Sequence, residues 1–337
     1  MRAVRLHNTD GPASLRVETI VQPSAGPREI VVRIERAAFN RRDLYIAQGR
    51  YARVRLPCTP GSDGAGTVAE LGPGVTGPPV GTRVVINPQL HWSDDSQQLH
   101  AFGRGEILGM PTDGTFAQYC LVPAENVFEQ PAGLTLDEAA ALPLAGLTAY
   151  RAVFTRGQIR ANDTVLITGV GSGVQTFVLL FAKHAGACTI VTSGSDEKLA
   201  RAKALGADIA INYKETREWH KAARDANGGR EPTLIVDGNG GDTLSKAIEI
   251  AAPGARVVLY GGTTGDVTLR PYSIFWKHLT IMGTSMGSPA DFRAMLALFA
   301  GGLRPVVDRV YPLEEAPQAA QRLLDSEQFG KVILAIE

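Results

Sequence analysis

TVLITGVGSGVQTFVLLFAKHAGA, residues 164–187, is the stretch that decides the fold of this chain. An apolar run ends in the closely spaced Gly169, Gly171 and Gly173, and an apolar segment with helical spacing follows at once. This order predicts a strand, a tight turn and a helix that open a βαβ unit. The N–H groups and the dipole at the start of such a helix attract anions, and glycine lets the backbone approach them. The stretch therefore predicts a site for the pyrophosphate of a dinucleotide.

The spacing of this turn departs from G-x-G-x-x-G, because Val174 occupies the sixth position. We expect Gly169, Gly171, Ser172, Gly173 and Val174 to form the cofactor loop, with altered packing of helix against strand at Val174. A tight structural turn that binds nothing is the alternative interpretation.

Helix and strand patterns alternate from about residue 126 onward, on both sides of the glycine turn. Strands separated by single helices require right-handed crossovers, so this region predicts a parallel sheet with helices on both faces. The chain before it carries short β-branched runs broken by Gly and Pro, such as 29–39, 64–72 and 81–87, which predict an antiparallel β domain. The last segment is too short for a domain and is expected to pack back onto the first. We predict an α/β chain with domains at 1–125 and 126–285 and a returning segment at 286–337.

The composition of the chain limits the classes of protein to which it can belong. A length of 337 residues is enough for about two domains. Lys and Arg number 34 and Asp and Glu also number 34, so no overall charge draws the chain to nucleic acid or to anionic lipid. Cys58, Cys120 and Cys188 are few, odd in number and far apart, which predicts buried small side chains without disulfides. With no apolar run of about 18 residues, we expect a soluble, cytoplasmic protein.

The end of the second predicted strand indicates which dinucleotide is bound. An NAD site usually has Asp or Glu about 20 residues past the first glycine, to bind the ribose hydroxyls. Here that strand ends in Thr192, Ser193, Gly194 and Ser195, with Lys198 one helical turn later. Hydroxyls donate to a 2′-phosphate and a lysine neutralises it, so these residues favour NADP(H). The alternative is that Ser195 or Asp196 only caps the following helix and Lys198 is a solvated surface residue.

The glycine loop and the β domain before it resemble the medium-chain dehydrogenase/reductase superfamily, in its zinc-free quinone oxidoreductase branch. The resemblance covers essentially the whole chain. It is carried by AAFNRRDLYIAQGRY (37–51), PGSDGAGTVAELGPGV (60–75), DGTFAQYCLVPAENV (113–127), AALPLAGLTAY (140–150) and FGKVILAI (329–336). It implies a Rossmann doubly wound parallel sheet together with a GroES-like antiparallel catalytic domain that forms a partial barrel.

The resemblance also implies that no catalytic metal binds. Zinc-dependent members of the superfamily hold the metal with Cys, His and Cys, and the matching positions here are Asn40, Ser62 and Leu144. The lobe of four cysteines that binds a structural zinc in those relatives is missing from 87–110, which we expect to be a surface loop. Its potential ligands have the spacing of no metal signature; they are His91, Asp94, Asp95, His100 and Glu106.

In this branch, the segment that matches Asn40, Asp43, Tyr45 and Tyr51 lines the cleft beside the nicotinamide. Without a metal, hydrogen-bond donors must polarise the substrate oxygen, so we expect Asn40, Tyr45 and Tyr51 to be catalytic, with a tyrosine as a possible proton donor. A turn-forming Asn40 and two partly buried, structural tyrosines are the alternative. Asp43 and Asp63 are expected to form ion pairs with nearby arginines.

The resemblance extends the cofactor site to later parts of the chain. Thr148 is expected to touch the nicotinamide, and Tyr213 matches a tyrosine near the adenosine 2′-phosphate of NADP-using relatives. Asn239 and Gly261 follow later strands, at the edge where a doubly wound sheet binds its ligand. Lys331 is expected to reach the phosphate on the nicotinamide side, although a solvated lysine is an alternative.

The predicted function is zinc-independent transfer of hydride from NADPH to a quinone or to an α,β-unsaturated carbonyl. One alternative is a zinc-type alcohol dehydrogenase. Another is a non-catalytic protein that binds NADPH or RNA, for which the five arginines between 41 and 55 could serve, although the overall charge makes a nucleic-acid partner the weaker hypothesis. The same arginines could instead receive an acidic substrate, and a solvated face is the interpretation that we favour. No membrane partner is expected. The apolar strand at 278–285 predicts a homodimer formed edge to edge.

Overall fold

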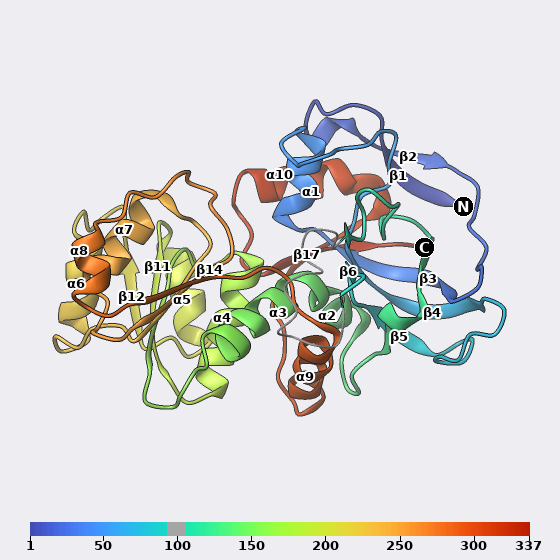
Figure 1. Cartoon of the computed structure of the whole chain (residues 1–337). Coiled ribbons are helices and arrows are strands. Elements are labelled where there is room, and N and C mark those ends of the chain that lie inside the picture. Colours follow the sequence, from blue (N-terminus) through green and yellow to red (C-terminus); the bar gives the residue numbers. More distant parts are fainter. Residues whose placement is uncertain (93–105) are drawn as a thin grey trace. The chain divides into compact units, whose positions relative to one another are not determined.

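The computed structural model describes residues 1–92 and 106–337, which divide into two compact units. Unit 1 combines Met1–Leu147 with Gly287–Glu337, and unit 2 is Thr148–Met286. Figure 1 shows the course of the chain through both units. The predicted loop residues Asp94, Asp95 and His100 lie outside the described residues.

Unit 2 is a six-stranded parallel sheet with the order β12-β11-β10-β13-β14-β15. Its elements are β10 (Thr164–Ile167), α4 (Gly173–His184), β11 (Cys188–Ser193), α5 (Asp196–Ala204), β12 (Ile209–Asn212), α6 (Trp219–Ala226), β13 (Leu234–Asp237), α7 (Gly241–Glu249), β14 (Arg256–Leu259), α8 (Pro271–Phe275) and β15 (Thr280–Gly283). The chain runs outward from β10 to β12 and then returns to place β13 on the other side of β10. This reversal creates the topological switch point at which doubly wound sheets bind ligands.

The central strands of unit 2 form because their residues are apolar on both faces. All four residues of β10 and all four of β13 are buried, as expected for parallel strands covered by helices on each side. Side chains of α6 and α7, among them Trp219 and Leu244, pack with Leu166 and Ile235 in one cluster. The Rossmann sheet predicted from the sequence is confirmed.

Unit 1 is built on a seven-stranded sheet in which β16, β17, β3, β4, β5 and β9 follow one another and β8 pairs with β3. The strands of the whole unit, of which β1, β2, β6 and β7 lie outside this sheet, are β1 (Arg2–Leu6), β2 (Leu15–Thr19), β3 (Glu29–Ala38), β4 (Asp63–Leu71), β5 (Arg83–Ile86), β6 (Gln89–Leu90), β7 (Glu106–Ile107), β8 (Tyr119–Pro123), β9 (Val127–Glu129), β16 (Val307–Pro312) and β17 (Lys331–Ala335). Its helices are α1 (Arg41–Ala47), α2 (Leu136–Ala141), α9 (Pro289–Ala300) and α10 (Ala316–Leu324), and α3 (Pro143–Tyr150) continues from unit 1 into unit 2. The pairs are antiparallel except β16 with β17, so the GroES-like antiparallel domain is also confirmed.

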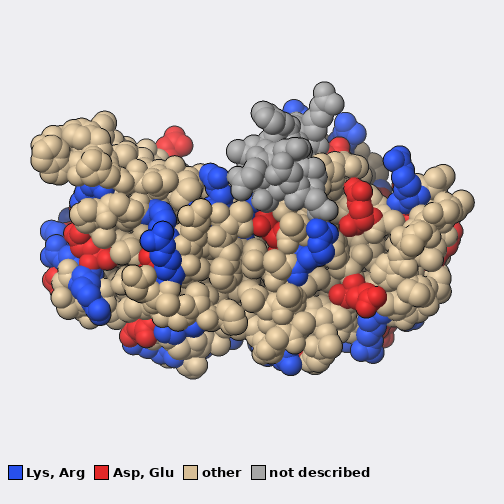
Figure 2. Space-filling model, turned by 60° about the horizontal axis from the view of Figure 1, so that its bottom comes forward, with Lys and Arg blue, Asp and Glu red and all other residues tan. Residues whose placement is uncertain are grey.

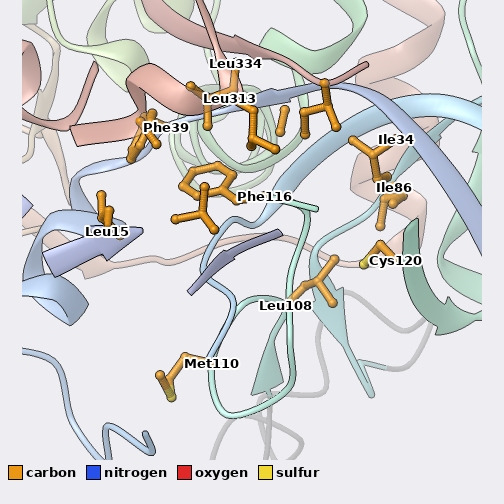
Figure 3. Close-up of a cluster of buried hydrophobic side chains, with 14 of the residues drawn as sticks. Leu15, Ile34, Phe39, Ile86, Leu108, Met110, Phe116, Cys120, Leu313 and Leu334 are labelled. Carbon is orange, nitrogen blue, oxygen red and sulfur yellow. The ribbon is translucent and has the colours of Figure 1, made fainter. Parts of the chain in front are cut away.

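One hydrophobic core holds unit 1 together. Figure 3 shows Phe39 and Phe116 close together in this cluster, and their ring centroids are 4.5 Å apart. Leu313 and Leu334, from the C-terminal segment, belong to the same cluster. Burying these side chains removes apolar surface from water, which is the main term that favours the folded state.

The boundary between the units lies at Leu147, whereas the sequence predicted it near residue 125. The intervening chain contains α2, whose residues Ala139, Ala140 and Ala141 are buried and which packs on β3, β4 and β17 of unit 1. Helical periodicity does not reveal which sheet a helix covers. Cys58, Cys120 and Cys188 are all free, but Cys188 is partly exposed rather than buried. Within the described residues, no helix is long and apolar enough to cross a membrane.

Candidate active site

The glycine turn lies at the end of β10, beside the switch point of unit 2. Gly169 has φ of 74° and Gly171 has φ of 113°, which are left-handed conformations that favour glycine. A Cβ on Gly169 would lie 3.0 Å from the side-chain nitrogen of Asn239, so glycine also keeps this space open. Ser172 caps α4 by accepting a hydrogen bond from the N–H of Gln175 at 3.4 Å. Gly173 and Val174 begin that helix.

Gln175 fixes the start of α4 against the sheet. Its side-chain nitrogen donates to the carbonyl oxygens of Thr168 at 3.0 Å and Val236 at 3.1 Å, and only 1% of the residue is exposed. Thr168 and Val236 belong to the ends of two neighbouring strands, so one buried amide joins the helix to both. The N-terminus of α4 is thereby held over the switch point, where its N–H groups can face an anion.

Asn239 and Gly261 come from the next strand ends. The Asp237 carboxylate accepts the N–H groups of Asn239 at 3.0 Å and Gly240 at 2.6 Å, which orders the turn after β13. Burial raises the pKa of Asp237, and its other oxygen accepts from the Thr168 hydroxyl. A Cβ on Gly261 would meet the carbonyl oxygen of Gly238 at 2.8 Å. The turn of Asn239 thus lies beside that of Gly169, as the switch point requires.

Tyr260 is a residue of this region that sequence reasoning missed. A Cβ on Gly238 would lie 2.3 Å from its ring, so the tyrosine lies directly against that glycine. Its phenol hydrogen bonds with Ser172, and burial raises its pKa. No short motif marks such a residue, because Gly238 and Ser172, which it contacts, belong to other turns at the ends of β13 and β10.

Several of the groups predicted to bind a 2′-phosphate lie near the end of β11. Ser195 accepts the N–H of Lys198 at 3.4 Å and so caps α5, as the structural interpretation expected. Its hydroxyl hydrogen is still available to an anion. A Cβ on Gly194 would meet the Tyr213 hydroxyl oxygen at 2.9 Å and the Lys214 Cε at 2.8 Å. Lys214, which was not predicted, therefore joins Tyr213 over Gly194.

Two further predicted residues in this unit are both buried. Thr148, 5% exposed, donates its hydroxyl to the sulfur of Met286 at 3.9 Å. Ser193 is also 5% exposed and accepts the N–H of Ser195 at 3.3 Å.

In unit 1, Asn40 sits between two charged groups. It follows the end of β3, whose neighbours in the sheet are β17 on one side and β4 on the other. The Lys331 ammonium donates to the Asn40 side-chain oxygen at 2.6 Å and to the Asp63 carboxylate at 2.9 Å. The Asn40 amide donates in turn to the same Asp63 oxygen at 2.9 Å. These three groups form a closed buried network that fixes the Asn40 side chain.

Lys331 is not placed as the sequence indicated. Only 2% of it is exposed, and a third hydrogen bond runs to the Phe39 carbonyl oxygen at 2.8 Å. Because an ammonium has three N–H donors, all of its capacity is used inside unit 1. We therefore remove Lys331 from the group of phosphate-binding candidates. The ion pair expected between Asp63 and an arginine is wrong, because Asp63 pairs with Lys331. Arg42 acts on Asp43 only as a nearby charge, without an ion pair between them.

Arg42 occupies the neighbourhood of Ser62. Its guanidinium donates to the Ser62 hydroxyl at 2.8 Å and to the carbonyl oxygens of Leu108 at 2.9 Å and Met110 at 3.0 Å. Ser62 donates its own hydrogen to Leu108 at 2.8 Å. Arg42 also lies over the Tyr51 ring, 4.8 Å from its centroid, and donates to the Tyr51 hydroxyl at 3.3 Å.

Asp43 is a buried carboxylate beside this network. One oxygen accepts the N–H of Asn40 at 2.8 Å, and the other has no hydrogen-bond partner. Burial raises the pKa of Asp43 to about 6, an effect that exceeds the opposing field of Arg42. The group therefore holds its proton over part of the mildly acidic range.

A divalent metal does not fit this donor set. Asn40 and Asp63 already bind the Lys331 ammonium, the Ser62 oxygen lies between Arg42 and Leu108, and Leu144 offers only its backbone N–H, which donates to Asp63 at 2.8 Å. Zinc prefers thiolate and imidazole ligands, and here it would have to displace one buried cation beside another. Within the described ranges, no three His, Cys, Asp or Glu side chains converge to hold a metal.

A cavity of about 440 Å³ lies elsewhere in unit 1, beside β8 and the segment between β2 and β3. Asp113, Tyr119 and Cys120 line it, whereas Asn40, Tyr45 and Tyr51 do not. We do not assign this cavity to the reaction.

Comparison with known proteins matches both units. Residues 26–132 match the family described as the alcohol dehydrogenase GroES-like domain, and residues 173–301 match the zinc-binding dehydrogenase family. A zinc-type alcohol dehydrogenase-like protein YogA from Leptosphaeria maculans is 33% identical, over 96% of this chain and 94% of the relative. A similarly described protein from Schizosaccharomyces pombe is 36% identical over 94% and 93%. Quinone oxidoreductase from Rattus norvegicus is 27% identical over 100% and 98%.

Solved structures agree over the whole length. A structure described as NAD-dependent alcohol dehydrogenase has a TM-score of 0.93 and 37% identity, and each chain covers 100% of the other. The 2-octenoyl-CoA carboxylase reductase CinF, in complex with NADP and 2-octenoyl-CoA, has a TM-score of 0.90 and 27% identity, covering 99% of this chain and 87% of that one.

Proposed function

We propose that this chain, which belongs to the medium-chain dehydrogenase/reductase superfamily, is an oxidoreductase that works without zinc, with NADPH as the reductant and a quinone or an α,β-unsaturated carbonyl as the substrate. One observation carries the zinc-free part of the proposal. The Lys331 ammonium already binds Asn40 and Asp63, where zinc-dependent members would hold a metal. Two relatives are described as zinc-type alcohol dehydrogenase-like proteins, but this chain has Asn40, Ser62 and Leu144 at the positions that match the Cys, His and Cys ligands of zinc-dependent members.

NADP(H) is the cofactor that the residues of unit 2 favour. Gly169, Gly171, Ser172 and the first turn of α4 would hold the pyrophosphate, and Asn239 would border it. At the end of β11, no carboxylate stands where a ribose-binding acid would be, and Lys198, Tyr213 and Lys214 would receive the 2′-phosphate. When bound, NADPH supplies a hydride and is oxidised to NADP⁺.

The residues of unit 1 have separate tasks in this reaction. As a quinone carbon or the β-carbon of an enone accepts hydride, electrons move onto the substrate oxygen, which needs hydrogen-bond donors. The Asn40 amide gives one of its two hydrogens to Asp63, and the second is available to that oxygen. Tyr45 and Tyr51 are partly exposed, and either hydroxyl can deliver the proton that completes the reduction. The rat relative is described as a quinone oxidoreductase and CinF is described in complex with 2-octenoyl-CoA, which support a quinone and an unsaturated acyl substrate respectively.

A homodimer formed through β15 belongs to the same proposal. This strand is at the edge of the six-stranded sheet, and such edges pair readily with another strand. On helix α8 Tyr272 and Phe275 are 63% and 55% exposed, and Trp276, the residue that follows the helix, is 69% exposed. Burying such large aromatic surfaces against a second copy would stabilise the pair.

The test is a steady-state assay of NADPH and NADH oxidation with a panel of quinones, enals and enones, together with metal analysis of the purified protein. We expect turnover with less than about one zinc per ten chains and no loss of activity with a chelator. We also expect Lys198→Ala with Lys214→Ala to abolish a preference for NADPH, whereas Lys221→Ala, in an exposed ion pair with Glu218, leaves it unchanged. Stoichiometric zinc, or no turnover across the whole panel, would overturn the proposal.

A further inference from the structure

The segment of residues 41–55, which begins with α1, carries a local excess of positive charge. Residues 41–55 contain five of the chain's 34 basic residues and only one acid, Asp43, although the whole chain is neutral. Figure 2 shows basic and acidic side chains interspersed over one face of the molecule. This segment also contains Tyr45 and Tyr51, the proposed proton donors.

Burial separates these charges into two groups. Arg42 and Asp43 are 8% and 2% exposed and belong to the interior. Arg50, Arg53 and Arg55 are exposed. The exposed part of the segment between 50 and 55 therefore presents only positive charge, with no acid beside it in sequence.

The backbone of this exposed part is anchored on the core. The side chains of Tyr51 and Val54 pack against the hydrophobic cluster of unit 1. The N–H of Arg50 donates to the Tyr45 carbonyl oxygen at 2.7 Å, and the N–H of Arg55 donates to the sulfur of Met110 at 3.3 Å. The arginines alternate with these anchors, so the packing that buries Tyr51 and Val54 directs Arg50, Arg53 and Arg55 outward.

Arg50 links this basic surface to the proposed site. Its guanidinium carbon lies 4.9 Å from the centroid of the Tyr45 ring, a cation–π contact. An anion bound by Arg50 would therefore lie within a few ångströms of a proposed catalytic side chain.

The three arginines also lack the carboxylate partners that some other arginines of unit 1 have. Arg5 pairs with Asp113, Arg36 with Asp137 and Arg322 with Asp308. In the described parts of the chain, no carboxylate lies within ion-pair distance of Arg50, Arg53 or Arg55. Arginine forks match the geometry of carboxylate and phosphate oxygens, and these three are not occupied by an internal acid.

We propose that Arg50, Arg53 and Arg55 bind the anionic tail, a carboxylate or a phosphate, of the substrate whose unsaturated carbonyl is reduced at Asn40. The inference rests on the proposed function and narrows it to anionic enones and enoyl thioesters. A small anion fits better than a nucleic acid, because the positive surface is confined to one short segment and the chain has no net charge.

The experiment compares substrates that share the reacting carbons and differ in charge. One pair is 4-oxopent-2-enoic acid and its methyl ester, which tests a carboxylate tail. The other is crotonyl coenzyme A and a neutral short thioester of crotonate, which tests a phosphate tail. Each is measured at low and high salt with the unaltered chain, with Arg50→Gln/Arg53→Gln/Arg55→Gln, and with Arg16→Gln, which changes an exposed arginine on β2.

We expect the triple variant to lose about tenfold or more of kcat/KM for at least one anionic substrate at low salt, through KM, while the neutral partners change less than about twofold. High salt should reduce the anionic advantage of the unaltered chain, and Arg16→Gln should behave like that chain. Equal losses for charged and neutral substrates, or no loss at all, would overturn this proposal. Turnover of neutral enones without a preference for anionic substrates would contradict the anion site alone. The absence of turnover with any substrate would contradict the proposed function.

Discussion

The Lys331 ammonium and the Asp63 carboxylate form an ion pair of 2.9 Å between side chains that are 2% and 0% exposed. The two residues begin β17 and β4, which flank β3 in the sheet. Both side chains form further hydrogen bonds. Lys331 also donates to Asn40 and Phe39, and Asp63 also accepts the N–H of Leu144. A buried pair of this kind holds Asn40 in one orientation.

Lys331→Met should destabilise the protein strongly, because it leaves the Asp63 carboxylate buried without its cation. We expect a loss of about 3–5 kcal/mol in the free energy of unfolding, measured by denaturant titration. Lys331→Met with Asp63→Asn should recover part of that loss, since no uncompensated charge remains. Lys183→Met is the matched control: its pair with Asp208 is partly exposed, so the cost should stay below about 1 kcal/mol. Equal losses in both lysine variants would contradict this account of the network.

Asp43 should make stability depend on pH in an unusual direction. Its pKa is about 6 in the folded state and 3.8 in the reference state, so the folded chain binds the proton more tightly. The contribution of this group is fully present below about pH 4 and is lost as the pH rises through 6, by about 3 kcal/mol at most. Asp43→Asn should remove this fall while keeping an acceptor for the Asn40 N–H.

The measurement for Asp43 is the free energy of unfolding between pH 4 and pH 8. Asp208 is the control: burial, the largest single effect, raises its pKa, but the hydrogen bonds with Lys183 and Thr189 together lower it below 3.8. Its contribution is lost only below about pH 4, so Asp208→Asn should leave the shape of the profile between pH 4 and pH 8 unchanged. An Asp43→Asn profile parallel to that of the unaltered chain would refute the assignment.

Gly169→Ala should weaken NADPH binding by about tenfold or more. The added Cβ would lie 3.0 Å from Asn239 in the turn that would hold the pyrophosphate, at a φ of 74°. Gly254→Ala provides the control, because Gly254 also has φ of 74° but no atom within 4 Å of the added Cβ. Both variants should lose about 1 kcal/mol of stability from left-handed strain, and only the first should lose affinity in a fluorescence titration. Similar NADPH affinities in the two variants would exclude this role for the turn.

Trp276→Glu should dissociate the proposed dimer. The side chain is 69% exposed and stacks with Tyr272, with ring centroids 5.6 Å apart, on the helix before the edge strand β15. A charge placed there would be desolvated on association, which disfavours it. Light scattering should give a mass near twice 35.9 kDa for the unaltered chain and near that value for the variant. Val21→Glu, at a 91% exposed position of unit 1, should remain dimeric. If the unaltered chain is monomeric, the proposal of a homodimer is wrong.

The sequence alone predicted the sheet of unit 2, the glycine turn and the residues around it, because each depends on a local pattern. A buried strand, Gly169 and Gly171 at positive φ and an amphipathic helix are all encoded within some 20 consecutive residues. Resemblance to a known superfamily added the positions of Asn40 and Ser62 and the absence of metal ligands there.

Tertiary structure decided the rest. Lys331 and Asn40 are 291 positions apart in sequence, and only the order β17-β3-β4 brings the ammonium, the amide and the Asp63 carboxylate together. Similarly, Lys214 joins Tyr213 over Gly194 only because β11 and β12 are neighbours. The partner of a buried charge is chosen by the register and packing of distant strands, and no pattern in a short stretch of residues specifies it.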